Sequence, residues 1–507
     1  MEQYVIGVDI GTTSTKAVLF RLNGEVVETA YAYYPLIKGR PELAEQDLGD
    51  IYQAVRSTIR EVVVQAKSEP EQVLCVSFSS AMHSLILMDK ENQPLTRSIT
   101  WADNRSIAYA EWLKAFGGAE LYHRTGTPLH PMSPLCKILW FKEEQPELFA
   151  QTDKFIGVKE YVFYQLFGQY KVDYSVASST GLFNIHKLAW DKLAMAKAGI
   201  TSEQLSKAVS PTDKVSGLSE EMAAELGLRT DTPFVLGGND GCLSNLGVGA
   251  VDPGAAAVTI GTSGAVRMVT DQPYIDLEGR TFCYVLDEKH WVVGGAVNNG
   301  GVVLDWARKR FAEKGEAESY EAVMKRIATV PAGSNGLLFH PYLNGERAPL
   351  WDADARGSFF GIHMMHESQH FLRAVLEGIC YNVYDVLTEI LSLAGKPEKI
   401  LATGGFSQSA VWRQMLTDVF QQDITLPESY ESSCLGAAVL GLKSIGFIES
   451  IDAVKEMVGS RRTYQPNARD SEVYRQTFPL YQKLSRQFAE YYQELVELQQ
   501  STDRHLL

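Results

Sequence analysis

Val8-Asp9-Ile10-Gly11-Thr12-Thr13-Ser14-Thr15-Lys16 is the stretch that decides the fold. The apolar runs on either side, Tyr4 to Val8 and Ala17 to Phe20, predict two short buried strands joined by a tight turn. Backbone N–H groups and hydroxyls in such a turn can bind phosphate, and a carboxylate at its entrance can face a hydrated magnesium ion. The alternative is an ordinary polar turn, which does not need this many polar groups. The stretch therefore favours a nucleotide-phosphate site, with Asp9 facing the metal.

A second copy of this turn occurs about half a chain length later. Ile260-Gly261-Thr262-Ser263-Gly264 repeats Ile10-Gly11-Thr12-Thr13-Ser14 and again lies between apolar runs, but Thr259 stands where the first copy has its acid. Two such hairpins facing each other across a cleft could hold opposite ends of one polyphosphate. A chance identity of a few residues is the alternative at this point.

Composition and charge indicate a large enzyme of the cytoplasm. A chain of 507 residues is long enough for two or three domains, each with its own core. The net charge of −15 argues against nucleic acid as the main partner. The six cysteines are scattered without zinc or redox spacing, which fits a reducing compartment. Neither a secretory signal nor an apolar run of membrane-spanning length is found, so no membrane association is expected.

Strands and helices alternate along both halves, which predicts α/β domains. Apolar spacing predicts helices over residues 47–65, 368–394 and 471–499, and the start of one over 135–142. Strands are expected over residues 73–77, 85–88, 234–238 and 400–403. The domain boundary is expected shortly after Gly237-Gly238-Asn239-Asp240-Gly241, which divides the chain into residues 1–247 and 248–507.

Several glycine-rich turns follow the predicted strands. Asp240 ends one strand near the boundary and is well placed for general-base work, but it could equally cap a helix that begins around Cys242. Two further turns, 294–301 and 404–409, put glycines at helix starts, where phosphate or ribose can approach the backbone. The chain has no G-x-x-x-x-G-K-[ST], and no G-x-G-x-x-G follows a strand, so neither a P-loop nor a dinucleotide fold is supported.

Two longer patterns resemble the FGGY family of carbohydrate kinases. The segment 344–351 (Asn-Gly-Glu-Arg-Ala-Pro-Leu-Trp), followed by 355–361 (Ala-Arg-Gly-Ser-Phe-Phe-Gly), is similar to the C-terminal signature of that family. The segment 132–140 (Met-Ser-Pro-Leu-Cys-Lys-Ile-Leu-Trp) is similar to the N-terminal signature. The resemblance covers nearly the whole chain. It implies two ribonuclease-H-like (actin-like ATPase) domains flanking a central cleft, with sugar binding in residues 1–247 and nucleotide binding in residues 248–507.

The resemblance also implies a role for individual residues. Asp9 would lie near magnesium, and Asp240 would take the proton from the attacking sugar hydroxyl. The residues that would contact ATP are Gly11, Thr12 and Thr13 in the first turn and Gly261, Thr262, Gly301, Gly405 and Ser409 in the second half. Relatives often carry Asn at the position of Ser409.

Three stretches around the sugar site look most like gluconokinases of the family, and xylulokinases are the alternative. They are residues 80–85, 99–106 and 126–134. The implied reaction transfers the γ-phosphate of ATP to the terminal hydroxyl of D-gluconate, giving 6-phosphogluconate. A site for this acid needs cationic or N–H donors at one end. The candidate substrate contacts are Met82, His83, Trp101, Arg105, His130 and Asp240.

Each candidate also has a purely structural interpretation. The histidines could be satisfied core or surface imidazoles, Arg105 an exposed ion pair, and Trp101 a core residue. An actin-like or chaperone-like ATPase would share the hairpins but would not need the Asp240 turn or the two long signatures. A sugar-sensing repressor would need a DNA-binding module, and no basic helix–turn–helix precedes Tyr4. The frequent dimers of the family make a homodimer an expectation.

Overall fold

The computed structural model describes residues 2–40, 42–311, 318–427, 431–459 and 461–505. Contacts divide the chain into two compact units that interleave in sequence. The first unit comprises Met1–Pro253, Val269–Val293 and Ser429–Gly459, and the second comprises Gly254–Met268, Gly294–Glu428 and Ser460–Leu507. Two segments from the second half of the sequence therefore complete the first unit. Within the described residues, no helix is both long and apolar enough to cross a membrane.

The first unit is built on a mixed six-stranded sheet. Its order is β13-β14-β5-β1-β2-β3, in which β1, β2 and β3 form an antiparallel meander while β5 and β14 run parallel to β1. The strands are β1 (Tyr4–Ile10), β2 (Ser14–Arg21), β3 (Val26–Tyr33), β5 (Val73–Ser80), β13 (Lys214–Val215) and β14 (Phe234–Asn239). The turn quoted above joins β1 to β2, as predicted.

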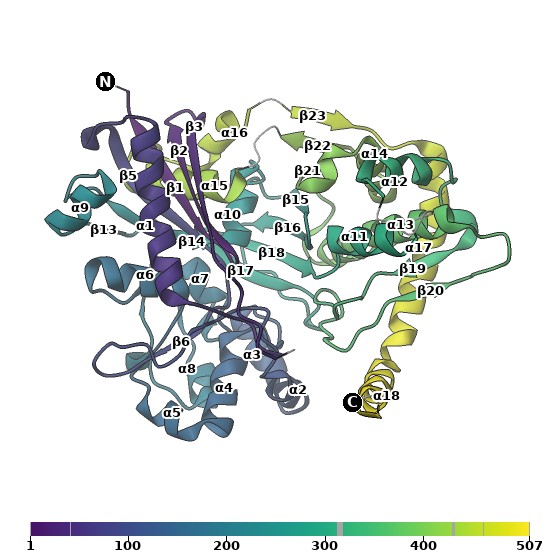
Figure 1. The fold of residues 1–507 in the computed structure, drawn as a ribbon, viewed down its shortest axis with the longest axis horizontal. Helices are drawn as coiled ribbons and strands as arrows, with labels where there is room; N and C mark the ends of the chain where they lie inside the picture. Colours follow the sequence, from purple (N-terminus) through teal and green to yellow (C-terminus); the bar gives the residue numbers. More distant parts are fainter. Residues whose placement is uncertain (1, 41, 312–317, 428–430, 460, 506–507) are drawn as a thin grey trace. The chain divides into compact units, whose positions relative to one another are not determined.

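Helix α1 (Leu48–Gln65) packs on this sheet and contacts β2 and β3 (Figure 1). Asp47 caps it by accepting hydrogen bonds from the N–H groups of Gly49 and Asp50. Its predicted apolar stripe, Ile51, Val55, Ile59 and Val62, is fully buried in the same core cluster as β1 and β5. Burial of each such side chain stabilises the fold by about 1.5–3 kcal/mol.

Helix α15 (Ser432–Ser444) comes from the second half of the sequence and contacts β1, β5 and β14. The backbones approach closely, because a Cβ placed on Gly7 of β1 would lie 2.1 Å from the carbonyl oxygen of Cys434. Helix α10 (Asp240–Gly247) packs against α15 in turn. The sequence of residues 1–247 alone gives no sign of this layer.

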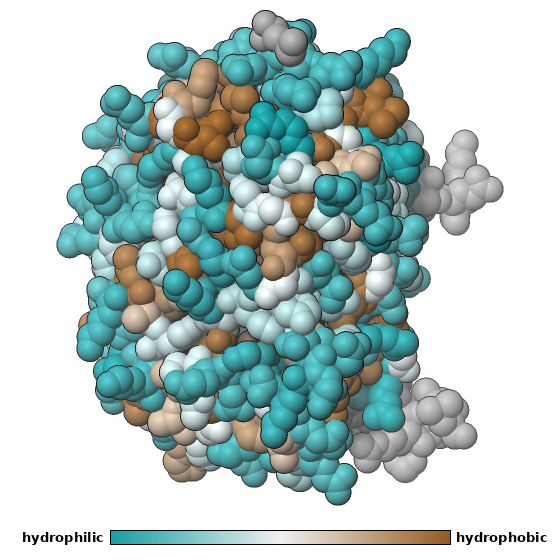
Figure 2. Space-filling view, turned by 90° about the vertical axis from the view of Figure 1, so that its left-hand side faces the viewer, coloured by the Kyte–Doolittle hydropathy of each residue, from teal (hydrophilic) through white to brown (hydrophobic). Residues whose placement is uncertain are grey.

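Figure 2 shows one face of the molecule, on which hydrophobic residues lie scattered among hydrophilic ones.

The second unit repeats the plan of hairpin plus parallel strands. Strands β15 (Ala255–Ile260) and β16 (Gly264–Thr270) form an antiparallel hairpin, and β21 (Lys399–Thr403) and β22 (Ile424–Pro427) add in parallel. Helix α13 (Ser368–Ala394) is contacted by the other helices of the unit. These are α11 (Gly301–Arg310), α12 (Tyr320–Ala328), α14 (Ala410–Phe420) and α17 (Ala468–Ala489).

Most predicted elements occur at the predicted residues. Helix α13 has the bounds given by its apolar spacing, and α4 (Pro134–Glu144) begins at the N-terminal signature. The tail expected to be helical over 471–499 is helical, but as two helices with a short break between them, α17 and then α18 (Tyr492–His505). After the break, Tyr492 packs in a buried cluster with Tyr342 and Ala355.

Candidate active site

The first hairpin turn places Asp9 at the end of β1, half-buried, with both carboxylate oxygens anchored. Oδ1 accepts a hydrogen bond from the hydroxyl of Ser79 at 2.7 Å, and Oδ2 accepts one from the hydroxyl of Ser433 at 2.8 Å. Ser79 lies on the neighbouring strand β5, and Ser433 lies on α15. These two hydroxyl donors fix the direction of the carboxylate.

Two side chains that were not predicted as site residues, Gln46 and Tyr34, hydrogen-bond to the backbone carbonyls of the first hairpin turn. The Gln46 side-chain amide donates to the carbonyl oxygens of Gly11 at 3.2 Å and Thr12 at 2.8 Å. The Tyr34 hydroxyl also donates to the Gly11 carbonyl at 2.8 Å. The Thr13 carbonyl accepts from the Tyr34 N–H at 3.1 Å. With its carbonyls bound on one side, the turn keeps a fixed shape.

Asp240 is the first residue of α10, directly after β14, and is half-buried. The helix cap is its neighbour Asn239, whose side-chain oxygen accepts the Cys242 N–H at 2.7 Å. The alternative in which Asp240 caps this helix is therefore wrong, because Asn239 fills that role. The Asp240 carboxylate accepts the Gly241 N–H at 2.7 Å. Asp240 thus lies at a strand-to-helix turn without being the helix cap. A carboxylate in this position can act as a proton acceptor.

His83 lies in the loop after β5, buried, with a backbone φ of 66° that side-chain-bearing residues rarely adopt. Its Nδ1 lies 2.7 Å from the Ser179 carbonyl oxygen, so Nδ1 carries the proton. In the neutral ring Nε2 is then an acceptor, which suits a sugar hydroxyl, whereas only the protonated ring would donate to a carboxylate from Nε2. Tyr284 packs its ring edge-on to the imidazole. Met82 beside it is half-buried.

Trp101 and His130 lie in two other loops of the first unit. The indole Nε1 of Trp101 donates to the Thr12 hydroxyl at 2.9 Å. A candidate sugar contact and a candidate phosphate contact are therefore joined directly. His130 is buried, and its Nδ1 accepts the Met132 N–H at 3.2 Å. The substrate roles of Met82, His83, Trp101 and His130 stay predictions.

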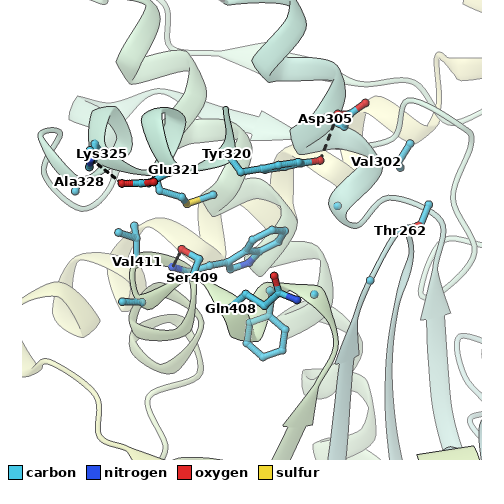
Figure 3. A pocket seen from close by; sticks show the side chains of 17 residues that line it. Thr262, Val302, Asp305, Tyr320, Glu321, Lys325, Ala328, Gln408, Ser409 and Val411 are labelled. Atoms are coloured by element: carbon cyan, nitrogen blue, oxygen red, sulfur yellow. Dashed lines mark hydrogen bonds and ion pairs between the residues drawn. The ribbon is translucent and has the colours of Figure 1, made fainter. Parts of the chain in front are cut away.

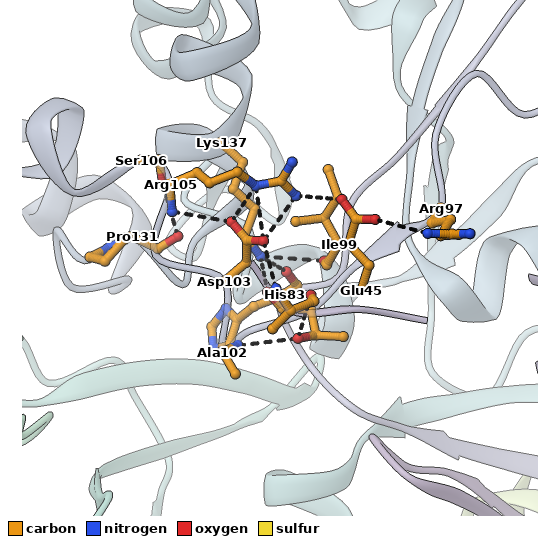
Figure 4. Close-up of polar contacts among 12 residues, drawn as sticks. Glu45, His83, Arg97, Ile99, Ala102, Asp103, Arg105, Ser106, Pro131 and Lys137 are labelled. Atoms are coloured by element: carbon orange, nitrogen blue, oxygen red, sulfur yellow. Dashed lines mark hydrogen bonds and ion pairs between the residues drawn. The ribbon is translucent and has the colours of Figure 1, made fainter. Parts of the chain in front are cut away.

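Arg105 lies in a cluster of charged residues (Figure 4). Its guanidinium contacts the Asp103 carboxylate at 2.9 Å and the Glu45 carboxylate at 2.7 Å. It also lies over the Trp140 ring. Arg105 is therefore in an ion pair, as in the alternative to gluconate binding, but its side chain is only 18% exposed, so the pair is not the exposed one that was expected. Its role as a carboxylate ligand stays a prediction.

Lys137 of α4 lies in the same cluster, and its side chain is 2% exposed. Its ammonium donates to the carbonyl oxygens of His83 at 2.6 Å and Thr100 at 2.7 Å. Burial lowers the pKa of Lys137 to about 7. This lysine belongs to the N-terminal signature and ties the loop of His83 to the loop that leads into Trp101.

The second unit contains a cavity of about 1000 Å³ (Figure 3). All five nucleotide-site residues predicted in the second half line it: Gly261, Thr262, Gly301, Gly405 and Ser409. The rest of the wall is largely apolar and aromatic, with Val302, Met324, Phe406, Val411 and Trp412. Polar side chains also line it, among them Asp305, Glu321, Lys325 and Gln408, so the cavity combines a polar turn and polar groups with an apolar, aromatic face, as the phosphates and the base of a nucleotide require. Ser409 caps α14 by accepting the Trp412 N–H at 3.3 Å.

The first N–H groups of α11 donate hydrogen bonds to the carbonyls of the second hairpin turn. The Gly301 N–H donates to the Gly261 carbonyl at 2.7 Å, and the Val302 N–H donates to the Thr262 carbonyl at 3.2 Å. A Cβ on Gly301 would lie 2.8 Å from the Gly261 carbonyl oxygen, so glycine permits this contact. These N–H groups therefore support the turn.

Glu346 of the C-terminal signature is a further residue that the sequence analysis did not select. It is fully buried, and its carboxylate accepts hydrogen bonds from the N–H of Asn298 at 2.5 Å and from the side chains of Asn299 at 2.9 Å and Asn382 at 2.7 Å. Burial raises the pKa of Glu346, against the hydrogen bonds from Asn299 and its other donors. Glu346 thus fixes the segment that leads into Gly301, and only its place in the signature could have indicated it.

The residues around Asp9 fit a magnesium ion that keeps most of its waters. In the part of the chain that the structure describes, no group of three or more His, Cys, Asp or Glu side chains could hold a metal. Magnesium often binds through one or two carboxylates together with water and substrate phosphates, so a single anchored carboxylate suffices.

The comparisons with known proteins cover the whole chain. The profile of the FGGY family of carbohydrate kinases, N-terminal domain, matches residues 4–247, and the C-terminal domain profile matches residues 256–445. A gluconokinase of Bacillus subtilis (strain 168) is 49% identical over 100% of both chains. A xylulose kinase of the same strain is 30% identical over 95% of this chain and 96% of its own.

Solved structures agree with this assignment. The crystal structure of gluconate kinase from Lactobacillus acidophilus has a TM-score of 0.94 and 38% identity, and covers 98% of this chain and 100% of its own. A structure titled ligand-bound xylulose kinase from the same species has the same TM-score and identity, and covers 97% and 100%. The mixed α/β units are thus the ribonuclease-H-like domains that were expected. The chain belongs to the FGGY family of carbohydrate kinases.

Proposed function

We propose that this carbohydrate kinase phosphorylates D-gluconate on its terminal hydroxyl, with ATP as donor and 6-phosphogluconate and ADP as products. The single observation that carries the choice of substrate is the 49% identity, over the full chain, to a protein named gluconokinase, against 30% to a protein named xylulose kinase. The identity of the sugar acid is the part of the proposal that an assay must decide.

The nucleotide is proposed to occupy the cavity of Figure 3, with its base against Trp412 and Met324 and its phosphates toward Thr262. The first turn, with Gly11, Thr12 and Thr13, is proposed to bind phosphate as well. Asp9 would hold magnesium through water, and this ion would supply charge neutralisation for the phosphates. The apolar wall favours the base because stacking and burial both stabilise it.

In the sugar site, Asp240 is proposed to accept the proton of the attacking hydroxyl. It directly follows β14, and Asn239 rather than Asp240 caps α10, which fits that task. His83 and Trp101 are proposed to position the hydroxyls of the open chain, together with Met82 and His130. Phosphoryl transfer depends mainly on such positioning and on charge neutralisation.

The first experiment measures ADP release with purified protein, Mg-ATP and a panel of aldonates, ketoses and polyols. Gluconate should give the highest kcat/KM, because the chain is 49% identical over its full length to a protein named gluconokinase. Strong turnover on xylulose with none on gluconate would replace the proposal by its alternative, a xylulokinase. The similarity to the structure titled xylulose kinase is the reason to include xylulose in the panel. ATP hydrolysis that no sugar changes would contradict both.

The second experiment replaces the base. Asp240→Asn keeps the size of the side chain, so the variant should fold normally while kcat falls by about 10²–10⁴-fold, the usual contribution of a general base. Thermal unfolding checks the fold, and the coupled assay measures kcat. A kcat near that of the wild type would remove Asp240 from the proposed role.

A cytoplasmic location is also proposed. All six cysteines lie in the described part of the chain, where they are buried and form no disulfide bond, as expected of a chain that folds in a reducing compartment. A homodimer stays a prediction that sedimentation can check.

A further inference from the structure

The first unit contains a second buried lysine, Lys159, which the proposed reaction does not use. Lys159 is the second residue of α6 (Val158–Phe167), and its side chain is 1% exposed. Its ammonium lies 2.6 Å from the carboxylate of Asp173, which is 0% exposed. A buried ion pair is costly to form, because two charges leave water. Pairs of this kind therefore call for an explanation other than stability.

The two remaining contacts of Lys159 are with the strand that carries Asp240. Its ammonium donates to the carbonyl oxygens of Leu236 at 2.8 Å and Gly238 at 3.0 Å. Both lie at the end of β14, within four residues before the proposed base. The ammonium thus pairs with one carboxylate and donates to two carbonyls, and these two hydrogen bonds fix the path of β14 where it turns into α10.

Asp173 reaches the same turn by a second route. Its other oxygen caps the short helix α7 (Tyr174–Ser178) by accepting the Val176 N–H at 2.8 Å. In α7, Ser175 binds Asn239: its hydroxyl accepts the Asn239 N–H at 3.2 Å, and its carbonyl accepts the side-chain amide at 3.0 Å. Asn239 directly precedes Asp240 and caps its helix. The carbonyls of β14 and the cap of α10 are therefore both tied to one buried pair.

We propose that the buried pair of Lys159 and Asp173 positions the Asp240 carboxylate for proton transfer, and this inference rests on the proposed function. The ammonium and the carboxylate contact each other and neighbouring backbone groups, and neither residue is one of the proposed substrate contacts. They act through the backbone of β14 and through Ser175 and Asn239. The pair is thus a positioning element, and its loss should lower kcat while leaving substrate binding nearly unchanged.

The test is a double-mutant cycle with the base. Lys159→Met should lower kcat by about 10-fold or more in the wild-type background and by less than about 2-fold in the Asp240→Asn background, because its effect passes through Asp240. The KM values for gluconate and ATP should stay within about 3-fold of wild type. Equal losses of kcat in both backgrounds would mean a general structural defect and would overturn the proposal.

Two further variants keep the test valid if Lys159→Met does not fold. Lys159→Met combined with Asp173→Asn removes both charges, so no unpaired charge is buried, and it should unfold near the wild-type temperature while still showing the kcat defect. Ser175→Ala removes one hydroxyl and no charge, and should lower kcat in the same direction. Wild-type kcat in both of these variants would overturn the proposal.

The outcomes separate this inference from the proposed function. If the wild type does not phosphorylate gluconate, or Asp240→Asn retains full kcat, the proposed function or base is wrong. If Asp240→Asn loses kcat while the paired variant and Ser175→Ala do not, only the positioning role is wrong. Lys137→Met is the comparison variant: it removes another buried lysine of the same unit, whose contacts lie on other loops, and its effect should appear mainly in the KM for gluconate.

Discussion

His340, at the end of β19 (Leu338–His340), shows how burial fixes the protonation state of a single residue. The ring is 0% exposed, with Nδ1 3.0 Å from the Ser358 hydroxyl and Nε2 3.0 Å from the Tyr481 carbonyl oxygen. The neutral ring satisfies both partners when Nε2 carries the proton. Burial lowers the pKa of His340 to about 4, against the Tyr481 hydrogen bond.

This residue predicts acid sensitivity of the second unit. Between the lowered pKa and the ordinary value near 6.5, the unfolded chain binds a proton that the folded one does not, so stability rises with pH there and is lost as pH falls. The loss should reach about 2 kcal/mol at about pH 5 and about 3 kcal/mol near pH 4, from about 1.4 kcal/mol per pH unit below about pH 6.5. Urea unfolding at about pH 7.5 and about pH 5 should show a smaller loss in His340→Gln than in the wild type. An equal loss in both proteins would contradict this prediction.

At the scale of elements, α4 is a helix that positions loops. Its Lys137 binds the carbonyls of His83 and Thr100, so one side chain fixes two loops of the proposed sugar site. Lys137→Met should raise the KM for gluconate by about 10-fold, a loss typical of one or two buried charge-assisted hydrogen bonds, and should change kcat less. Steady-state kinetics checks both values.

The control for this variant lies on the same helix. Lys142 is only partly buried and lies in the last turn of α4, so Lys142→Met tests whether any lysine change in the helix has the same effect. It should leave the KM for gluconate near the wild-type value. If both variants raise KM equally, the backbone contacts of Lys137 are not the cause.

Elements set by local pattern could be predicted, and contacts between distant segments could not. The stripe of Ile51, Val55 and Ile59 indicated α1, and the repeated Ile-Gly-Thr turn indicated both hairpins. By contrast, the pairing of Lys159 with Asp173 and the hydrogen bond from Ser433 to Asp9 join segments whose local sequence carries no periodic signal. Arg105 shows the converse, since the resemblance of residues 99–106 to gluconokinases suggested a ligand, while Asp103 and Glu45 pair with its guanidinium.

At the scale of the whole molecule, the interleaved units predict that the first half of the chain does not fold alone. A fragment of residues 1–247 keeps all six strands of the first sheet but lacks α15, which covers β1, β5 and β14. The exposed apolar face should make it aggregate or unfold at a lower temperature than the full chain. Circular dichroism of the fragment, alone and co-expressed with residues 248–507, checks this.

The control is a fragment of the first unit to which α15 has been added back. Residues 1–253 joined by a flexible linker to 431–459 should recover helical signal and a cooperative transition, because α15 returns to the strands it covers. A fragment 1–247 that unfolds cooperatively near the temperature of the full chain would contradict the prediction.

The close approach of Gly7 to the Cys434 carbonyl has a consequence for synthesis in the cell. On the ribosome, β1 is made early, but the helix that seals its backbone emerges only after most of the chain has been translated. Until α15 has been synthesised, one side of the nascent sheet stays uncovered. The packing of α15 on the sheet is therefore completed only at the end of translation or after it. Chaperones that shield apolar surface should bind this intermediate, and slower translation of the second half should prolong that binding.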